Sequence, residues 1–171
     1  ELKLDFSDVL FRPKRSTLSS RKNVDLIRNF KFKYSQNEWS GIPLFSSNMD
    51  TIGTPEMFKA LSAYRMITCL HKFIDVQEII ELCKKNKHCT SDYFALSTGI
   101  EQKDLEMLHT RVNNFKQAGI DVKFICIDVA NGYMFKLVDF CKRIRTQFPN
   151  TTIVAGNVVS RELVEELLIN G

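Results

Sequence analysis

The chain has 171 residues and a mass of 19.8 kDa, enough for one domain with a hydrophobic core of its own. Hydrophobic residues make up 44% and charged residues 26%, which excludes a disordered chain, and 7 Gly with 4 Pro exclude a collagen-like one. The formal net charge of +4 indicates no concentrated basic face, and no apolar run reaches the roughly 18 residues of a membrane span. We therefore expect neither nucleic acid nor a membrane as a partner.

Residues 1–40 form an N-terminal arm that lies outside the repeating pattern of the rest. One interpretation is a hairpin or arm packed on the bottom or rim of the domain, with its charges in solvent. The other is an anion-binding arm, because the paired donors of Arg suit phosphate. The arm carries five basic and then four aromatic residues: Arg12, Lys14, Arg15, Arg21, Lys22, Phe30, Phe32, Tyr34 and Trp39.

Residues 41–171 repeat one unit, which consists of a short apolar strand, a polar turn and an amphipathic helix. Such short apolar runs are typical of parallel strands that are covered on both faces. The predicted strands are Ile42–Ser46, Met66–Leu70, Tyr93–Ser97, Lys123–Asp128 and Thr152–Ala155.

The segments between these strands carry helix start and stop signals. Thr54 and Pro55 suit an N-cap and the first helical position, and Asp75 with Glu78 has the spacing of a capping box. Three more helices are expected after these. The first has an apolar stripe from Leu105 to Phe115 and ends at Gly119, and the other two are Tyr133–Phe148 and Ser160–Asn170.

Alternating strands and helices predict a parallel α/β fold. Five units suit a complete flavodoxin-like sheet, and they also suit the first five units of a TIM (β/α)8 barrel. All five strands run into polar residues, and only a closed ring brings every strand end to one mouth. This pattern favours the barrel, with the functional site just past the carboxyl ends of the strands. Those ends are Asn48-Met49-Asp50-Thr51, His71-Lys72, Ser97-Thr98-Gly99, Asp128 to Gly132, and Gly156-Asn157.

Each ionisable or amide residue at these ends allows two interpretations. Lys72 is either a partly desolvated cation for charge pairing or proton chemistry, or half of a salt bridge to Asp128 or Asp50. Asp128 orients a ligand or caps the next helix. His71 is a general base or a hydrogen-bonded structural group. Asn157 follows a Gly that lets a ligand approach the backbone, or it belongs to a plain turn.

The cysteines and other motifs point to no metal and no visible nucleophile. The five cysteines contain no CxxC pair, which favours a reducing, cytoplasmic compartment. Cys83, His88 and Cys89 lie close together in a lysine-rich segment without a second ligand pair, so we expect no zinc site. The sequence has no Walker loop, GxGxxG or GxSxG motif.

Taken together, the strand-end motifs resemble those of GMP reductases. The resemblance covers the whole chain in order and is carried by Lys3 to Leu10, Arg12 to Thr17, Asn48 to Thr51, His71-Lys72, Asp128 to Tyr133 and Ala155 to Val159. The sister family, IMP dehydrogenase, typically reads Ser-Pro-Met-Asp at 47–50 and Asp-Ser-Ser-Gln-Gly at 128–132. It also carries regulatory modules where this chain has only the short stretch Lys84–Ser91.

The resemblance implies a cytoplasmic, homotetrameric TIM-barrel enzyme that reduces GMP to IMP with NADPH and releases ammonia. It places Met49 and Asn157 near the purine. It implies that Lys72 and the segment Asp128-Val129-Ala130 line the nicotinamide side. Ser20 and Arg21 would reach the cofactor of a neighbouring subunit.

Two departures from the family pattern matter. Phe73 stands where the family commonly has a second histidine. The chain also ends at Gly171, before the loop that in the family carries the catalytic cysteine, its threonine partner and a potassium site. We therefore expect no catalytic nucleophile among the five cysteines, a longer protein around this segment, and no reductase activity from residues 1–171 alone.

Overall fold

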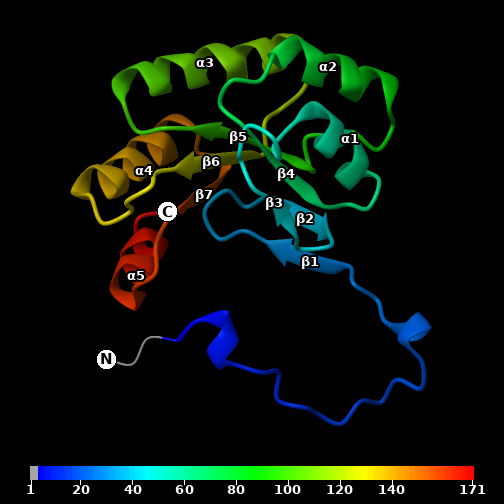
Figure 1. Cartoon of the computed structure of the whole chain (residues 1–171). Helices are drawn as coiled ribbons and strands as arrows, with labels where there is room; N and C mark the ends of the chain where they lie inside the picture. The colour runs from blue at the N-terminus through cyan, green and yellow to red at the C-terminus, as the bar shows by residue number, and fades with distance from the viewer. Residues whose placement is uncertain (1–3) are drawn as a thin grey trace.

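The computed structural model describes residues 4–171, which form a curled five-stranded parallel sheet with helices on its outer side (Figure 1). The strands lie side by side in chain order: β3 (Phe45–Ser46), β4 (Ile67–Leu70), β5 (Phe94–Thr98), β6 (Phe124–Asp128) and β7 (Thr152–Gly156). A flavodoxin-like sheet reverses its strand order part-way, whereas a barrel adds each strand beside the previous one. The observed order therefore excludes the flavodoxin-like alternative and confirms the first five units of a TIM barrel.

The helices pack on the convex face of the sheet. They are α1 (Pro55–Ser62), α2 (Val76–Lys85), α3 (Gln102–Gln117), α4 (Phe135–Gln147) and α5 (Arg161–Ile169). Thr54 caps α1 as predicted, by accepting a hydrogen bond from the N–H of Met57 at 3.2 Å. Asp75 caps α2 through the N–H of Gln77 rather than through a box with Glu78. No helix in the described part of the chain is long and apolar enough to cross a membrane.

Two predicted starts were wrong by more than one residue. Strand β3 is shorter than predicted because Pro43 has no N–H to donate to a neighbouring strand. Helix α4 begins two residues later than predicted, because the N–H of Tyr133 donates to Oδ1 of Asn131 at 3.1 Å in a turn before the helix.

Side chains alternate across the sheet and build two apolar layers. The outer layer lies between sheet and helices and contains Leu70, Phe94, Leu96, Ile125 and Ile127. The inner layer lies on the concave side and contains Ile67, Cys69, Ala95, Phe124 and Cys126, together with Trp39 from the N-terminal hairpin. The interior of the half-barrel is therefore packed rather than open.

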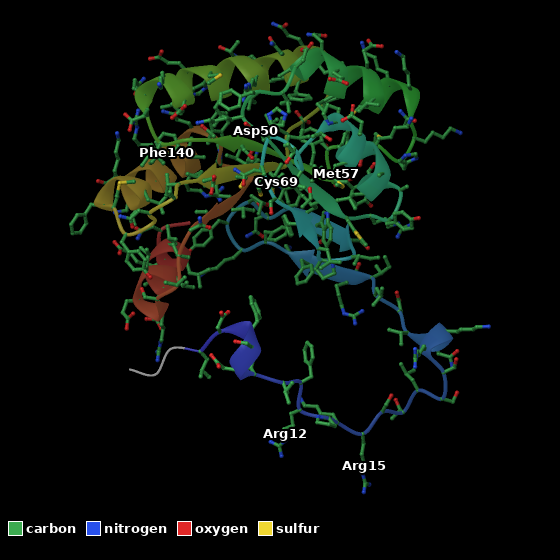
Figure 2. The ribbon with its side chains drawn as sticks, viewed as in Figure 1. Arg12, Arg15, Asp50, Met57, Cys69 and Phe140 are labelled. Atoms are coloured by element: carbon green, nitrogen blue, oxygen red, sulfur yellow. The ribbon has the colours of Figure 1, made fainter. Side chains whose placement is uncertain are left out.

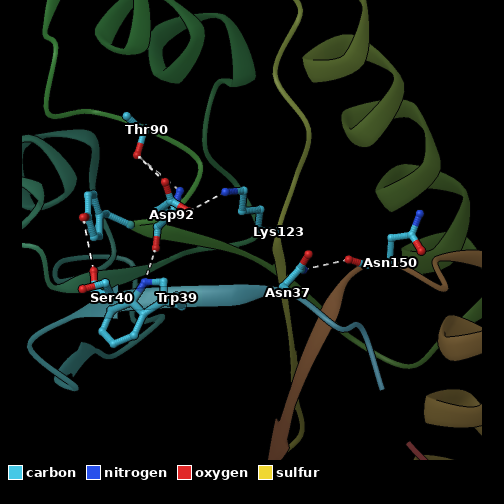
Figure 3. Close-up of polar contacts among 8 residues, drawn as sticks. Asn37, Trp39, Ser40, Thr90, Asp92, Lys123 and Asn150 are labelled. Carbon is cyan, nitrogen blue, oxygen red and sulfur yellow. Dashed lines mark hydrogen bonds and ion pairs between the residues drawn. The ribbon is translucent and has the colours of Figure 1, made fainter. Parts of the chain in front are cut away.

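An antiparallel hairpin of β1 (Arg28–Lys31) and β2 (Glu38–Gly41) closes the bottom of the half-barrel. Trp39 is 5% exposed, and its indole N–H donates to the backbone carbonyl of Asp92 at 2.8 Å (Figure 3). Lys123 binds the Asp92 carboxylate at 2.6 Å, and the side chain of Asn37 donates to the carbonyl of Asn150 at 2.8 Å. The predicted hairpin at the bottom of the domain is confirmed.

Residues 4–27 extend away from the sheet and hold only two short 3-10 turns, Phe6–Asp8 and Arg21–Asn23 (Figure 1). Phe6 is 94% exposed and Phe11 is fully exposed. Arg12 and Arg15 point away from the body of the molecule (Figure 2). The expected packing on the domain is thus made by the hairpin, while this segment presents its apolar and basic side chains to solvent.

Candidate active site

The loops after the parallel strands meet at one end of the half-barrel, which we call the mouth. The side chains of Asn48, after β3, and Asp128, at the end of β6, are in direct contact there. Nδ2 of Asn48 donates to Oδ2 of Asp128 at 3.0 Å. Because β4 and β5 separate these two strands in the sheet, this bond spans the mouth. The sequence-based placement of polar strand ends around one mouth is therefore confirmed for β3 and β6.

The Asp128-Val129-Ala130 segment and Asn157 are joined through their backbones. The N–H of Val129 donates to the carbonyl of Gly156, and the N–H of Asn157 donates to the carbonyl of Val129, both at 2.9 Å. The expected nicotinamide-side segment and the expected purine-side residue are thus neighbours in one rigid pair of loops. The capping interpretation of Asp128 was wrong, because the N-cap of α4 is Met134.

Gly132 makes the close contact of these two loops possible. Its N–H donates to the carbonyl of Asn157 at 3.0 Å, and a Cβ built on Gly132 would lie 2.0 Å from that same oxygen. Real Cβ atoms do not approach a backbone oxygen so closely, so one loop must move when any side chain is added. Gly132 therefore fixes the position of Asn157 at the mouth.

We expect Gly132→Ala to lower the free energy of unfolding by about 1–3 kcal/mol, through overpacking, and to displace Asn157 from its position at the mouth. Thermal denaturation and a crystal structure of the variant measure the two effects. Gly119→Ala is the matched control, because its Cβ meets no atom within 4 Å but its φ of +76° strains a side chain. It should lose about 1 kcal/mol and leave Asn157 in place. Unchanged stability and an unmoved Asn157 in Gly132→Ala would contradict this role.

Lys72 follows β4 and is exposed, so the expected partial desolvation was wrong. The structure also forms no salt bridge from Lys72 to Asp128 or Asp50 within residues 4–171. Its ammonium lies over the ring of Phe73, 5.2 Å from the centroid, and its backbone carbonyl accepts a hydrogen bond from the guanidinium of Arg111 on α3. The cation is thus held near the mouth by its backbone and an aromatic ring, with its charge open to a ligand.

His71 has the structural role that we considered as the alternative to a general base. Its ring Nδ1 accepts a hydrogen bond from the backbone N–H of Phe73 at 3.1 Å, and the backbone N–H of His71 donates to the carbonyl of Gly53 at 3.0 Å. These bonds shape the turn that carries Lys72. Gly53 lies against the backbone of β4 at this turn, because a Cβ built on it would lie 2.2 Å from the carbonyl oxygen of Cys69. No larger residue fits there without a backbone shift.

Met49 lies in the tight turn after β3. Its carbonyl accepts hydrogen bonds from the N–H groups of Ile52, at 2.9 Å, and Gly53, at 2.8 Å. The side chain is 60% exposed, which leaves the thioether available to pack on a flat ring.

Ser20 and Arg21 lie on the extended N-terminal segment, and this chain does not bring them to its own mouth (Figure 1). The hydroxyl of Ser20 accepts a hydrogen bond from the N–H of Lys22 at 3.2 Å and so starts a 3-10 turn. Both side chains are exposed. Within the described chain, the structure thus brings neither residue to the other predicted site residues.

All five cysteines are free, and four of them are buried. Burial raises the pKa of Cys83 and of Cys141 to about 11. The hydrogen bond between Cys69 and Cys126, together with burial, raises the pKa of the Cys69 thiol, and the same hydrogen bond lowers the pKa of the Cys126 thiol. Residues 4–171 also contain no cluster of three or more His, Cys, Asp or Glu able to hold a metal ion.

Sequence reasoning assigned no individual role to three residues that shape this site. The bond from Asn48 to Asp128 joins loops 80 residues apart, and the motif around Asn48 gave no sign of it. Arg111 occupies an ordinary helical position with no motif. Gly132 was visible in the Asp128–Gly132 motif, where a glycine after a strand is a signal of close backbone approach.

Comparison with known proteins agrees with this geometry. The family model described as IMP dehydrogenase / GMP reductase domain matches residues 3–171. The chain belongs to the IMP dehydrogenase / GMP reductase family. GMP reductase 2 of Bos taurus is 46% identical and GMP reductase of Aliivibrio fischeri (strain MJ11) is 44% identical, each over the whole chain and 48% of the relative. The chain therefore spans about half the length of the curated relatives it matches.

A solved structure of the family has the same fold. Inosine 5' monophosphate dehydrogenase from Legionella pneumophila superposes with a TM-score of 0.72 at 26% identity, covering 97% of this chain and 47% of that one. The curled sheet of this chain is thus part of the family's barrel. The named relatives at 44–46% identity are GMP reductases, which agrees with the reductase-type motifs at 47–50 and 128–132.

Proposed function

We propose that the protein containing this chain is a GMP reductase, which converts GMP to IMP with NADPH and releases ammonia. The observation that carries this proposal is the similarity of the whole chain to curated GMP reductases, 46% to the Bos taurus and 44% to the Aliivibrio fischeri enzyme. In this reaction the hydride of NADPH forms a new C2–H bond on the purine and the C2–NH2 bond breaks. The amino group takes up one proton and leaves as ammonia.

The donor set at the mouth fits the nicotinamide end of NADPH. A nicotinamide carboxamide has both an N–H donor and a carbonyl acceptor, and the mouth offers the Asp128 carboxylate as acceptor and the Lys72 ammonium as donor. Ala130 beside them is exposed and small, which leaves room for a ring. NADPH, when bound, supplies the hydride. Lys72 and Asp128-Val129-Ala130 bind and orient it in this proposal.

Met49 and Asn157 are the proposed purine contacts. The exposed thioether of Met49 packs on the face of the base, while Asn157, fixed by the bond between its carbonyl and Gly132, holds the edge of the ring. The positive charge of Lys72 favours departure of the amino group by stabilising electron density that builds up at the reacting centre. The catalytic cysteine, its threonine and a potassium site belong, in this proposal, to a part of the protein outside residues 1–171.

We further propose a cytoplasmic homotetramer in which Ser20 and Arg21 reach the cofactor of a neighbouring subunit. The nearly complete exposure of Phe6, Leu10 and Phe11 supports this arrangement, because such apolar side chains need a partner surface to leave water. Arg21 would then place a phosphate-binding guanidinium on the neighbour's cofactor.

The direct test is the consumption of NADPH by the intact protein with and without GMP. We expect GMP-dependent loss of NADPH absorbance, with IMP and ammonium formed in equal amounts. Residues 1–171 expressed alone should show no turnover. An IMP dehydrogenase is the second candidate, favoured by the structural match to the Legionella pneumophila enzyme. Reduction of NAD+ in the presence of IMP, without NADPH consumption on GMP, would replace the proposed function by that one.

A further inference from the structure

The side-chain bond between Asn48 and Asp128 connects two loops at the mouth that are distant in the sheet. Nδ2 of Asn48 lies 3.0 Å from Oδ2 of Asp128, and the residues are 80 positions apart in the chain. Strands β3 and β6, which carry them, have β4 and β5 between them. A bond across that gap forms only when both side chains point into the mouth.

The alternation of β6 gives the direction of Asp128. Phe124 and Cys126 belong to the inner apolar layer, and Asp128 is two residues further on the same strand. Its carboxylate therefore points to the concave side, directly above that layer. Asn48 is half-buried and follows β3 by two residues, so its amide enters the mouth from the opposite edge.

The bond leaves one carboxylate oxygen of Asp128 for a ligand. Oδ2 accepts from Asn48, and the structure gives Oδ1 no hydrogen-bond donor among residues 4–171. The carboxylate itself is exposed, so without the amide it would rotate freely in solvent. A hydrogen bond to an ionised group is stronger than a neutral one and fixes the rotamer. The amide thus selects the orientation of the free oxygen.

We propose that Asn48 is a positioning residue that holds the Asp128 carboxylate in the orientation that binds the nicotinamide end of NADPH. This inference rests on the proposed function and assigns to that site a residue that acts through another residue. Asn48 suits the role because its amide donates to a carboxylate without adding charge. Aspartate at the same place would set two negative charges about 3 Å apart and turn Asp128 away.

The experiment compares Asn48→Ala, Asn48→Asp and the exchanged pair Asn48→Asp with Asp128→Asn in the intact protein. We expect Asn48→Ala to raise the Kd and KM for NADPH about 10-fold, the loss of one charge-assisted bond, with the KM for GMP changed less than about twofold. Asn48→Asp should have the larger effect. The exchanged pair remakes the hydrogen bond but moves the charge to the other loop, so it should regain the wild-type Tm without regaining NADPH affinity.

Asn113→Ala is the matched control, because Asn113 is an exposed asparagine in the C-terminal half of the outer helix α3. It should match wild type in Tm, Kd and kcat. Unchanged NADPH affinity in Asn48→Ala would overturn the proposal. A lower Tm with unchanged kinetics would do the same, since it would show a purely structural bond.

A crystal structure of Asn48→Ala separates this proposal from the proposed function. We expect the Asp128 carboxylate to rotate away from its wild-type position, whatever reaction the enzyme catalyses. An unmoved Asp128 would overturn the positioning role even in a confirmed GMP reductase. Absence of GMP-dependent turnover in wild type would instead overturn the proposed function, while a rotated Asp128 would still support Asn48 as its positioning residue.

Discussion

Replacing Lys72 by Met should lower kcat for GMP reduction by about 100- to 1000-fold, while the affinity for GMP changes little. Methionine keeps most of the length and the apolar stem of lysine but removes the charge. The structure places that charge at the mouth, over the ring of Phe73 and without an ion-pair partner in the described chain. A cation that is not neutralised by the protein is available to stabilise the departing amino group in the transition state.

Steady-state kinetics with GMP and NADPH, together with GMP titration, separate these two effects. Lys116→Met is the matched control, because Lys116 is also exposed but lies in the last turn of the outer helix α3, at the end away from the mouth. It should leave kcat within about twofold of wild type, as expected for a surface substitution away from the site. Equal losses of turnover and of GMP binding in Lys72→Met would show that Lys72 only binds substrate, contrary to its proposed role.

Replacing Trp39 by Ala should lower the free energy of unfolding by about 3–5 kcal/mol. The indole fills the bottom of the half-barrel, packs 6.0 Å from the ring of Phe30, and is 5% exposed. Its removal leaves a cavity beside the inner layer and an unpaired carbonyl at Asp92, which the indole N–H binds at 2.8 Å. Trp39→Phe keeps much of the packing and loses the bond, so it should cost about 1–2 kcal/mol.

Urea denaturation of the intact protein measures these differences. Tyr64→Ala is the control, because Tyr64 is 66% exposed, and it should change stability by no more than about 0.5 kcal/mol. The folded molecules of Trp39→Ala should have the same kcat as wild type, because Trp39 lies at the end of the half-barrel opposite the mouth. A loss below about 1 kcal/mol in Trp39→Ala would show that the hairpin does not close the half-barrel.

The parts of the fold that depend on local pattern could be predicted from the sequence. Apolar runs and caps such as Thr54 placed the strands and helices close to their observed bounds. The polar residues after the strands were expected at one mouth, and the contact between Asn48 and Asp128 bears this out. Parallel strands share a direction, so their carboxyl ends share an edge, whatever the details of packing.

The failures concern features that depend on the curl of the sheet and on neighbours distant in sequence. Lys72 is exposed after β4, and no local signal in the sequence specifies this. The partner of Asp128 follows from how far the sheet closes. The N-terminal segment was expected to pack on the domain. Within the described chain, only its hairpin does so, because Trp39 packs into the inner apolar layer.

A crystal structure of the intact protein with GMP and a nicotinamide cofactor bound tests the proposed site most directly. We expect the nicotinamide to contact Lys72 and Asp128-Val129-Ala130, and the purine to lie against Met49 and Asn157. We also expect Arg21 of one subunit to reach the cofactor of another. A cofactor bound away from the mouth, with Lys72 and Asp128 both facing solvent, would contradict the proposed site.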